Sequence, residues 1–119
     1  MSEHLGTFEQ AVLLSLAHPR TELGREGYGR AIIKEVEHRL ERGVSAGAVY
    51  ATLDRLEAKG LVSSKLAPGT AVRAGRPRRH YTITCNGVHE LRSAKAAVRR
   101  LWTGVRLPVK RNTMNPPRR

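Results

Sequence analysis

The 119-residue sequence lacks several features that would assign it to common classes of protein. A single cysteine excludes an intrachain disulfide framework and a zinc site made of four cysteines. No apolar run is long enough to span a bilayer, and the N-terminus lacks the basic and then apolar pattern of a signal peptide. We therefore expect a soluble, cytoplasmic protein with no membrane partner.

Aromatic residues are also scarce, at 4% of the chain, so the core of this single domain must be mainly aliphatic. Proteins that bind single-stranded RNA usually stack its bases on aromatic side chains, and this sequence has few of them. No serine, cysteine or acid belongs to a recognisable catalytic arrangement, and no glycine-rich phosphate loop follows a strand. The sequence thus predicts a protein that is not an enzyme and has no cofactor.

Acidic residues almost disappear from the second half of the chain. Residues 1–64 contain eight basic and nine acidic residues, for a net charge of −1, whereas residues 65–119 contain fourteen basic residues and one acid, for a net charge of +13. The whole chain has a formal charge of +12 and a sequence pI near 11.2. This balance favours a polyanionic partner.

The most informative stretch, residues 45–60, has the pattern of a capped amphipathic helix. Ser45 suits the N-cap, and Gly60 suits the left-handed position that ends a helix. Val49, Leu53 and Leu56 recur at helical spacing and are expected to face a core.

The opposite face of this helix is small and nearly uncharged. A solvated helix would be expected to have Glu and Lys there, so this composition indicates contact with another molecule, although a plain alanine-rich packing helix would look similar. The residues expected to face outward are Ala46, Gly47, Tyr50, Ala51, Thr52 and Arg55.

Two helices are expected before this one. Residues 5–17 are apolar on more than one face, which predicts a helix packed between two partners. A second helix starts near Tyr28 and has an apolar residue every four positions as far as Leu40. Gly43 is expected to end it, and the short turn into Ser45 makes a helix-turn-helix unit.

Beyond Gly60 the pattern becomes extended and predicts a hairpin of two strands, residues 61–66 and 79–84, with Tyr81 and Ile83 on the buried face. The connection, residues 67–78, contains prolines, glycines and arginines but no acid. We expect it to be a flexible cationic tip, the alternative being a merely solvated loop.

A last helix is expected over residues 85–106, capped by Thr84 or Asn86. Its apolar residues form a short heptad-like seam, which predicts pairing with a second copy; folding back on the domain is the alternative. Residues 107–119 are expected to be a disordered basic tail. The seam residues are Leu91, Ala94, Val98, Leu101 and Val105, with Trp102 beside them.

Between about residues 5 and 101 the chain resembles the PadR family of winged-helix transcriptional regulators. Each motif of this resemblance is short, but their ordered combination is fairly specific. The motifs are Gly27–Gly29 with Ile32–Glu35, Gly47–Glu57, Lys59–Val62 and Gly75–Tyr81. Two residues depart from the family pattern: Ala51 stands where proline is frequent, and Ala48 where serine or threonine is frequent, so the base preference of relatives does not transfer.

The resemblance implies a mainly α fold with a small β-hairpin: a winged helix-turn-helix domain over residues 1–84, then a C-terminal dimerisation helix. It implies a dimeric repressor that binds an inverted-repeat operator in double-stranded DNA, in a bacterial cytoplasm and associated with the nucleoid. It also implies that the first and last helices build the dimer interface. The expected interface residues are Leu5, Phe8, Val12, Leu91, Val98, Leu101, Trp102 and Val105.

With this fold the third helix would enter the major groove, and the wing would contact the DNA backbone or the adjacent minor groove. The expected DNA-binding residues are Ser45, Ala46, Tyr50, Ala51, Thr52, Arg55, Arg73, Arg76, Arg78 and Arg79.

Other interpretations remain open at this point. Trp102 is expected to be a packing anchor, the alternative being the wall of a pocket for a small aromatic effector. His80, Cys85 and His89 suggest a metal sensor, but a buried Cys85 and no metal are the expectation. The alternative functions are a protein–protein adaptor and a non-specific architectural DNA-binding protein.

Overall fold

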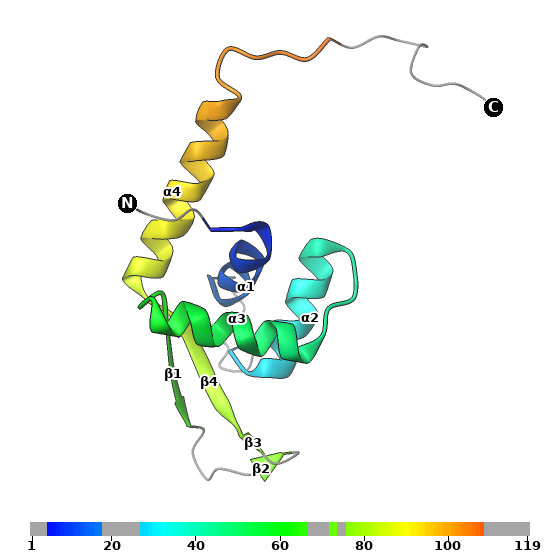
Figure 1. The fold of residues 1–119 in the computed structure, drawn as a ribbon, viewed down its shortest axis with the longest axis vertical. Helices are drawn as coiled ribbons and strands as arrows, with labels where there is room; N and C mark the ends of the chain where they lie inside the picture. Colours follow the sequence, from blue (N-terminus) through cyan, green and yellow to red (C-terminus); the bar gives the residue numbers. More distant parts are fainter. Residues whose placement is uncertain (1–4, 18–26, 67–71, 74–75, 109–119) are drawn as a thin grey trace, which may run out of the picture.

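The computed structural model describes residues 5–17, 27–66, 72–73 and 76–108. Within these ranges the order of elements is that of a winged helix followed by one long helix (Figure 1). This confirms the predicted fold class, mainly α with a small β-hairpin. The elements are α1 (Thr7–Ala17), α2 (Gly29–Leu40), α3 (Ala46–Ala58), β1 (Val62–Leu66), β2 (Val72–Arg73), β3 (Arg76–Pro77), β4 (Arg79–Ile83) and α4 (Cys85–Leu101).

The core is aliphatic and centres on α1, which packs against α2, α3, α4 and β4. Val12 and Leu13 are fully buried, as the apolar character of this helix on several faces predicts. Ser15 is buried as well, and its hydroxyl donates to the Val12 carbonyl oxygen at 2.6 Å, so it enters the core with its hydrogen bond satisfied.

α2 presents Ile32 and Val36 to the core and ends earlier than expected. The helix stops at Leu40, and Glu41 takes the left-handed conformation with φ 56° instead of Gly43. The Glu37 carboxylate then accepts from the Val44 N–H at 3.1 Å. This side chain therefore shapes the turn into α3.

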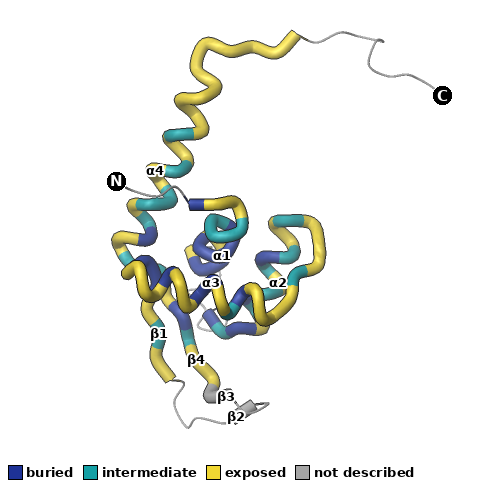
Figure 2. The backbone as a smooth tube through the Cα atoms, in the orientation of Figure 1, coloured by how far each residue is buried: buried dark blue, intermediate teal, exposed yellow. Residues whose placement is uncertain are grey.

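α3 forms as its sequence predicts. The Ser45 hydroxyl accepts from the Ala48 N–H at 3.0 Å, which confirms the N-cap, and Gly60 follows the helix with φ 79°. Val49, Leu53 and Leu56 are fully buried. The helix crosses the front of the molecule in Figure 1 and shows its exposed surface in Figure 2.

The wing is an antiparallel pair of β1 and β4, in register from Val62 opposite Ile83 to Leu66 opposite Arg79. Tyr81 faces the helices and is buried, and Ile83 is partly buried against the same core. The connection contains a second, unexpected ladder, in which Val72 of β2 lies opposite Pro77 of β3. Of the rest of the predicted flexible tip, Arg78 is described, and residues 67–71 and 74–75 lie outside the described residues.

α4 begins on the wing and then leaves the body. The Thr84 hydroxyl accepts from the Gly87 N–H at 3.0 Å and donates to the Gly60 carbonyl oxygen at 2.8 Å, so the cap also fixes the helix to the end of α3. Farther along, the helix extends away from the other elements, and its last turns are largely exposed (Figures 1 and 2). The segment predicted as a tail is described only as far as residue 108.

Candidate nucleic-acid interface

The exposed face of α3 is built from very small side chains. Ala46, Gly47 and Ala48 in the first turn are exposed, and so is Ala51 one turn later. Ser45 caps this end, where the N–H groups of the first turn lack partners within the helix. A helix N-terminus with no bulky side chains lets another backbone approach closely and attracts anions.

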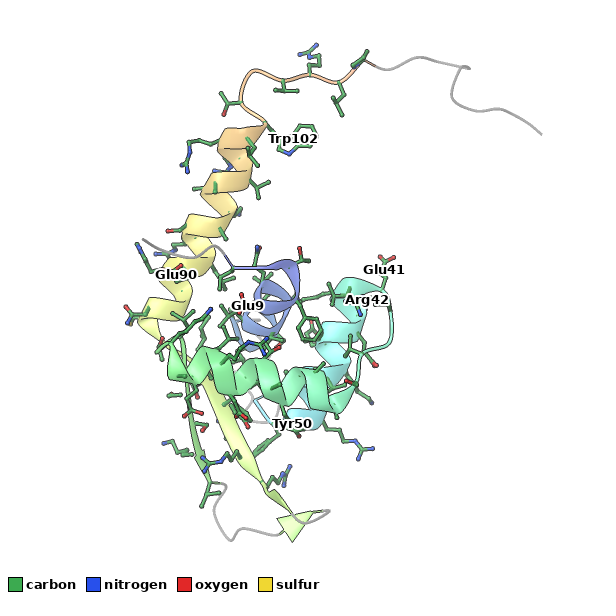
Figure 3. All side chains as sticks on the ribbon, in the orientation of Figure 1. Glu9, Glu41, Arg42, Tyr50, Glu90 and Trp102 are labelled. Atoms are coloured by element: carbon green, nitrogen blue, oxygen red, sulfur yellow. The ribbon has the colours of Figure 1, made fainter. Side chains whose placement is uncertain are left out.

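Two residues expected on this face lie elsewhere. Thr52 is only 2% exposed and belongs to the core side of α3, so the prediction that it faces outward is wrong. Tyr50 is half-buried: its ring packs against the hydrophobic core, and its hydroxyl touches Gly29 so closely that any Cβ there would collide with it. Tyr50 thus braces α3 against the first turn of α2 (Figure 3).

Arg55 is exposed on α3, and its position depends on Thr52. The Arg55 Nη2 donates to the Thr52 Oγ1 at 3.1 Å. Because Thr52 is fixed by burial, this hydrogen bond restricts the conformation of the Arg55 side chain. The remaining N–H groups of the guanidinium stay available to other acceptors. Thr52 therefore contributes to this surface by orienting Arg55 rather than by direct contact.

Polar contacts hold the far end of α3 against its neighbours. The Ser64 hydroxyl on β1 donates to the Glu57 carboxylate, at 3.0 Å from Oε2, and accepts from the Arg79 Nη1 at 3.1 Å. Lys59 pairs with Glu9 of α1 across 3.4 Å. Both strands of the wing and α1 are thereby connected to the C-terminal half of α3.

The wing arginines are only partly described. Arg73 and Arg76 lie on the short strands β2 and β3, and their side chains fall outside the described part of the structure. Arg78 and Arg79 are exposed, and Arg78 lies over the ring of Tyr28, with its Cζ 4.1 Å from the ring centroid. The sequence offered little sign of this contact, because Tyr28 fitted the apolar stripe of α2 and lies fifty residues earlier in the chain.

The outer half of α4 carries a large apolar surface. Val98, Leu101, Trp102 and Val105 are 50%, 76%, 53% and 51% exposed, whereas Leu91 packs against the core nearer the body. Ala94 and Ala97 line a groove between this part of α4 and the start of α1; its other lining residues are Leu5, Gln10, Val98, Arg100 and Leu101. In the protomer the outer seam residues Val98, Leu101 and Val105 do not fold back on the body; their pairing with a second copy stays a prediction.

The expected contribution of α1 to a dimer needs correction. Val12 is fully buried within the protomer and cannot touch a second copy. Phe8 is partly buried against the core and has the Arg42 guanidinium over its ring, at 6.0 Å from the centroid. Leu5 is 8% exposed and lines the groove beside α4.

The residues that suggested a metal sensor are His80, Cys85 and His89. Cys85, the first residue of α4, is exposed, so the expectation that it is buried is wrong. His80 packs its ring edge-on against Tyr28, at 4.9 Å between centroids and 74° between planes. Among the described residues, no three His, Cys, Asp or Glu side chains gather in a group that could hold a metal ion.

Across the described ranges, every helix is too short or too polar to cross a bilayer.

Comparison with known proteins agrees with this architecture. The sequence profile of the transcriptional regulator PadR-like family matches residues 21–93. No curated protein matches the chain. Among solved structures, a PadR-like transcription factor from Bacteroides fragilis is 27% identical, with a TM-score of 0.64 over 84% of this chain and 87% of that one.

A PadR family transcriptional regulator from Eggerthella lenta DSM 2243 is 29% identical, with a TM-score of 0.54 over 79% of this chain and 76% of that one. A PadR family transcription regulator from Clostridium difficile R20291 is 24% identical, covers 82% and 93% of the two chains and has a TM-score of 0.60; at this identity it supports the fold.

Proposed function

Because this chain belongs to the transcriptional regulator PadR-like family, we propose that it is a sequence-specific repressor that binds an inverted-repeat operator in double-stranded DNA as a homodimer. The observation that carries the proposal is the exposed, nearly uncharged first half of α3, on a helix that packs against a wing leading into the cationic half of the chain. Specific DNA binding needs both a slim reading element and phosphate-binding arginines around it.

In this proposal the N-terminal half of α3 enters the major groove. Ala46 and Ala51 allow the helix to lie close to the base edges, and the exposed N–H groups after Ser45 bind a phosphate oxygen. Arg55 is the side chain best placed to reach a base edge, since it is exposed and oriented by Thr52. Tyr50 acts mainly through its hydroxyl contact with α2, which sets the angle of the reading helix.

The wing adds affinity that depends little on sequence. Its arginines are proposed to contact the backbone or the adjacent minor groove, where charge matters more than base identity. Salt dependence is therefore expected to be steep. The wing residues assigned this role are Arg73, Arg76, Arg78 and Arg79.

Dimerisation is proposed to occur through the apolar face of α4. A single helix-turn-helix contacts few base pairs, and a two-fold pair matched to an inverted repeat is the usual way to gain specificity. Val98, Leu101 and Val105 would pack between copies, together with the groove beside Leu5. Val12 has no part in this interface because it is buried within the protomer.

Trp102 is proposed as a packing anchor of that interface. It is the only tryptophan and is half-exposed in the protomer, so its fluorescence reports directly on burial between copies. A blue shift of its emission as protein concentration rises is expected. A shift produced instead by flat aromatic compounds at constant concentration would assign Trp102 to an effector pocket.

The test is binding to a labelled duplex from upstream of the protein's own gene, compared with a scrambled duplex of equal length over a series of salt concentrations. A preference that survives near-physiological salt is expected for a specific regulator. Equal and steeply salt-sensitive binding to both duplexes would favour an architectural DNA-binding protein. No binding to either duplex would favour an adaptor.

Arg55→Ala tests the reading helix. This change is expected to reduce the difference in binding free energy between specific and random DNA by roughly 1–3 kcal/mol. Thr52→Val should have a smaller effect in the same direction, since it removes only the hydroxyl that orients Arg55. Equal losses on specific and random DNA for Arg55→Ala would contradict its role in discrimination.

A further inference from the structure

Two adjacent arginines, Arg78 and Arg79, lie at the start of β4, which we call the root of the wing. Their guanidinium groups contact different residues. Arg78 lies over the ring of Tyr28, with its Cζ 4.1 Å from the centroid. Arg79 donates from Nη1 to the Ser64 Oγ at 3.1 Å, and the same hydroxyl donates to the Glu57 carboxylate. The two side chains have the same charge and similar exposure, but their surroundings give them different capacities for a further partner.

The Tyr28 ring is a rigid support for Arg78. The backbone of Tyr28 is the extended N-cap of α2 and forms an antiparallel bridge with His80 of β4. The imidazole of His80 packs edge-on against the ring. In addition, the Tyr81 N–H donates to the Gly27 carbonyl oxygen at 2.8 Å. The wing and the start of α2 are thus joined by backbone contacts at Gly27 and Tyr28 and by the contact between the His80 and Tyr28 rings.

This support also lies next to the reading helix. Gly29 follows Tyr28 directly, and the hydroxyl of Tyr50 on α3 touches Gly29. A guanidinium placed over Tyr28 therefore projects from the same part of the surface as the N-terminal half of α3. DNA that meets that half of α3 would meet Arg78 as well.

A guanidinium packed over an aromatic face still has N–H groups in its own plane that can donate to an anion. It also loses less conformational freedom when it binds, because the ring already restricts its rotamers. Arg79 differs, since part of its donor capacity is used on Ser64 next to an acid.

We propose that Tyr28 is a positioning residue for DNA binding, which holds Arg78 as the phosphate contact at the root of the wing. Arg79, which was given a DNA contact together with the other wing arginines above, then serves mainly to tie the wing to α3, so its share of phosphate binding is the smaller one. This inference rests on the proposed DNA-binding function and adds a division of roles between two neighbouring arginines. It also assigns a role in binding to a tyrosine that does not itself touch DNA.

The experiment measures affinity for the upstream duplex against salt concentration for single and double variants of the full chain. Arg78→Gln is expected to make the slope of log K against log salt shallower by about 1, the value for one lost phosphate contact. Arg79→Gln removes the same charge and is the matched control, with less than half of that change. These two side chains are exposed, so this contrast does not depend on any change to the core.

Tyr28→Leu is expected to weaken binding about three- to ten-fold with the slope retained, because the charge remains while its placement is lost. Tyr28→Phe keeps the ring and should bind like the unaltered protein. The double variant Tyr28→Leu/Arg78→Gln should bind no more weakly than Arg78→Gln alone, since Tyr28 acts only through Arg78. Thermal unfolding of each variant identifies those that remain folded.

Three results would overturn the inference while leaving the proposed function intact. They are equal slopes for Arg78→Gln and Arg79→Gln, an additive loss in the double variant, and a loss in Tyr28→Phe as large as in Tyr28→Leu. If the unaltered protein itself does not distinguish the upstream duplex from the scrambled one, the proposed function fails instead. Failure of the inference therefore appears in the comparison of variants, and failure of the proposed function in the comparison of the two duplexes.

Discussion

The winged-helix body and the outer half of α4 contain the same kinds of apolar residue in opposite surroundings. Leu53 and Leu56 of α3 are fully buried, whereas Leu101 of α4 is 76% exposed (Figure 2). Both helices repeat their apolar residues at helical spacing, so periodicity does not distinguish them. The difference is that the described elements bury the apolar face of α3 but leave the end of α4 largely exposed.

The two regions also differ in their polar contacts. In the body, side-chain hydrogen bonds join α3 to both wing strands, through Glu57, Ser64 and Arg79. In the last turns of α4 the one side-chain hydrogen bond among the described residues is local, from the Thr103 hydroxyl to the Arg99 carbonyl oxygen. A contiguous exposed apolar surface of this kind usually marks an interaction site. We therefore expect the end of α4, unlike the body, to be covered by association with a second copy, as proposed above.

The largest expected effect contrasts one leucine from each region. Leu53→Ala should lower the free energy of unfolding by about 2–5 kcal/mol at any protein concentration, because it leaves a cavity in a closed core. Leu101→Ala should cost less, and its cost should fall on dilution as copies separate. Urea unfolding at two protein concentrations checks both. A concentration-independent loss for Leu101→Ala would mean that the end of α4 packs on its own body.

The second prediction places a charge on the apolar face of α4. Leu101→Asp should raise the dissociation constant of the dimer at least about ten-fold, since a carboxylate would be buried between copies without a partner. Ala96→Asp adds the same charge on the opposite, exposed side of the helix and should leave association unchanged. Sedimentation at micromolar concentration gives the measurement. A monomeric unaltered protein, or equal effects of the two variants, would remove the role assigned to α4.

The third prediction compares the N-caps of the two helices. Ser45→Ala should cost about 1 kcal/mol, as for a cap that makes one hydrogen bond. Thr84→Ala should cost more, because Thr84 both caps α4 and donates to the Gly60 carbonyl oxygen. Urea unfolding of the two variants gives the difference. A smaller cost at Thr84 would mean that even the start of α4 is weakly attached to the body.

Local signals accounted for most of the fold. The cap at Ser45, the glycine after α3 and the pairing of the wing strands depend on neighbouring residues and on period, and the structure confirms them. The family resemblance, carried by motifs in order, is also confirmed. The end of α2 was misplaced, because Glu41 takes a left-handed conformation that glycine would be expected to take.

The candidate site was less predictable, because its arrangement depends on residues distant in sequence. Thr52 was expected outside for its polarity, although it lies three residues after Val49 and four before Leu56, on the same side of the helix. The ring of Tyr28 under Arg78 joins segments fifty residues apart, and no local pattern indicates it. The DNA contacts themselves remain predictions.

The smallest expected effect tests whether the wing stays packed against the core through Tyr81. Burial is the main cause that raises the pKa of Tyr81 above 10.0, and the negative charge of Asp54 adds to it. Below about pH 10 this tyrosine is neutral in both states, so it adds no pH dependence. Above it the unfolded chain loses the proton first, and the free energy of unfolding should fall by up to about 1 kcal/mol by pH 10.5. Tyr81→Phe should remove this part of the decline, measured by urea unfolding between pH 9 and 10.5. An equal decline in both proteins would mean that water reaches the phenol and that the wing moves apart from the core.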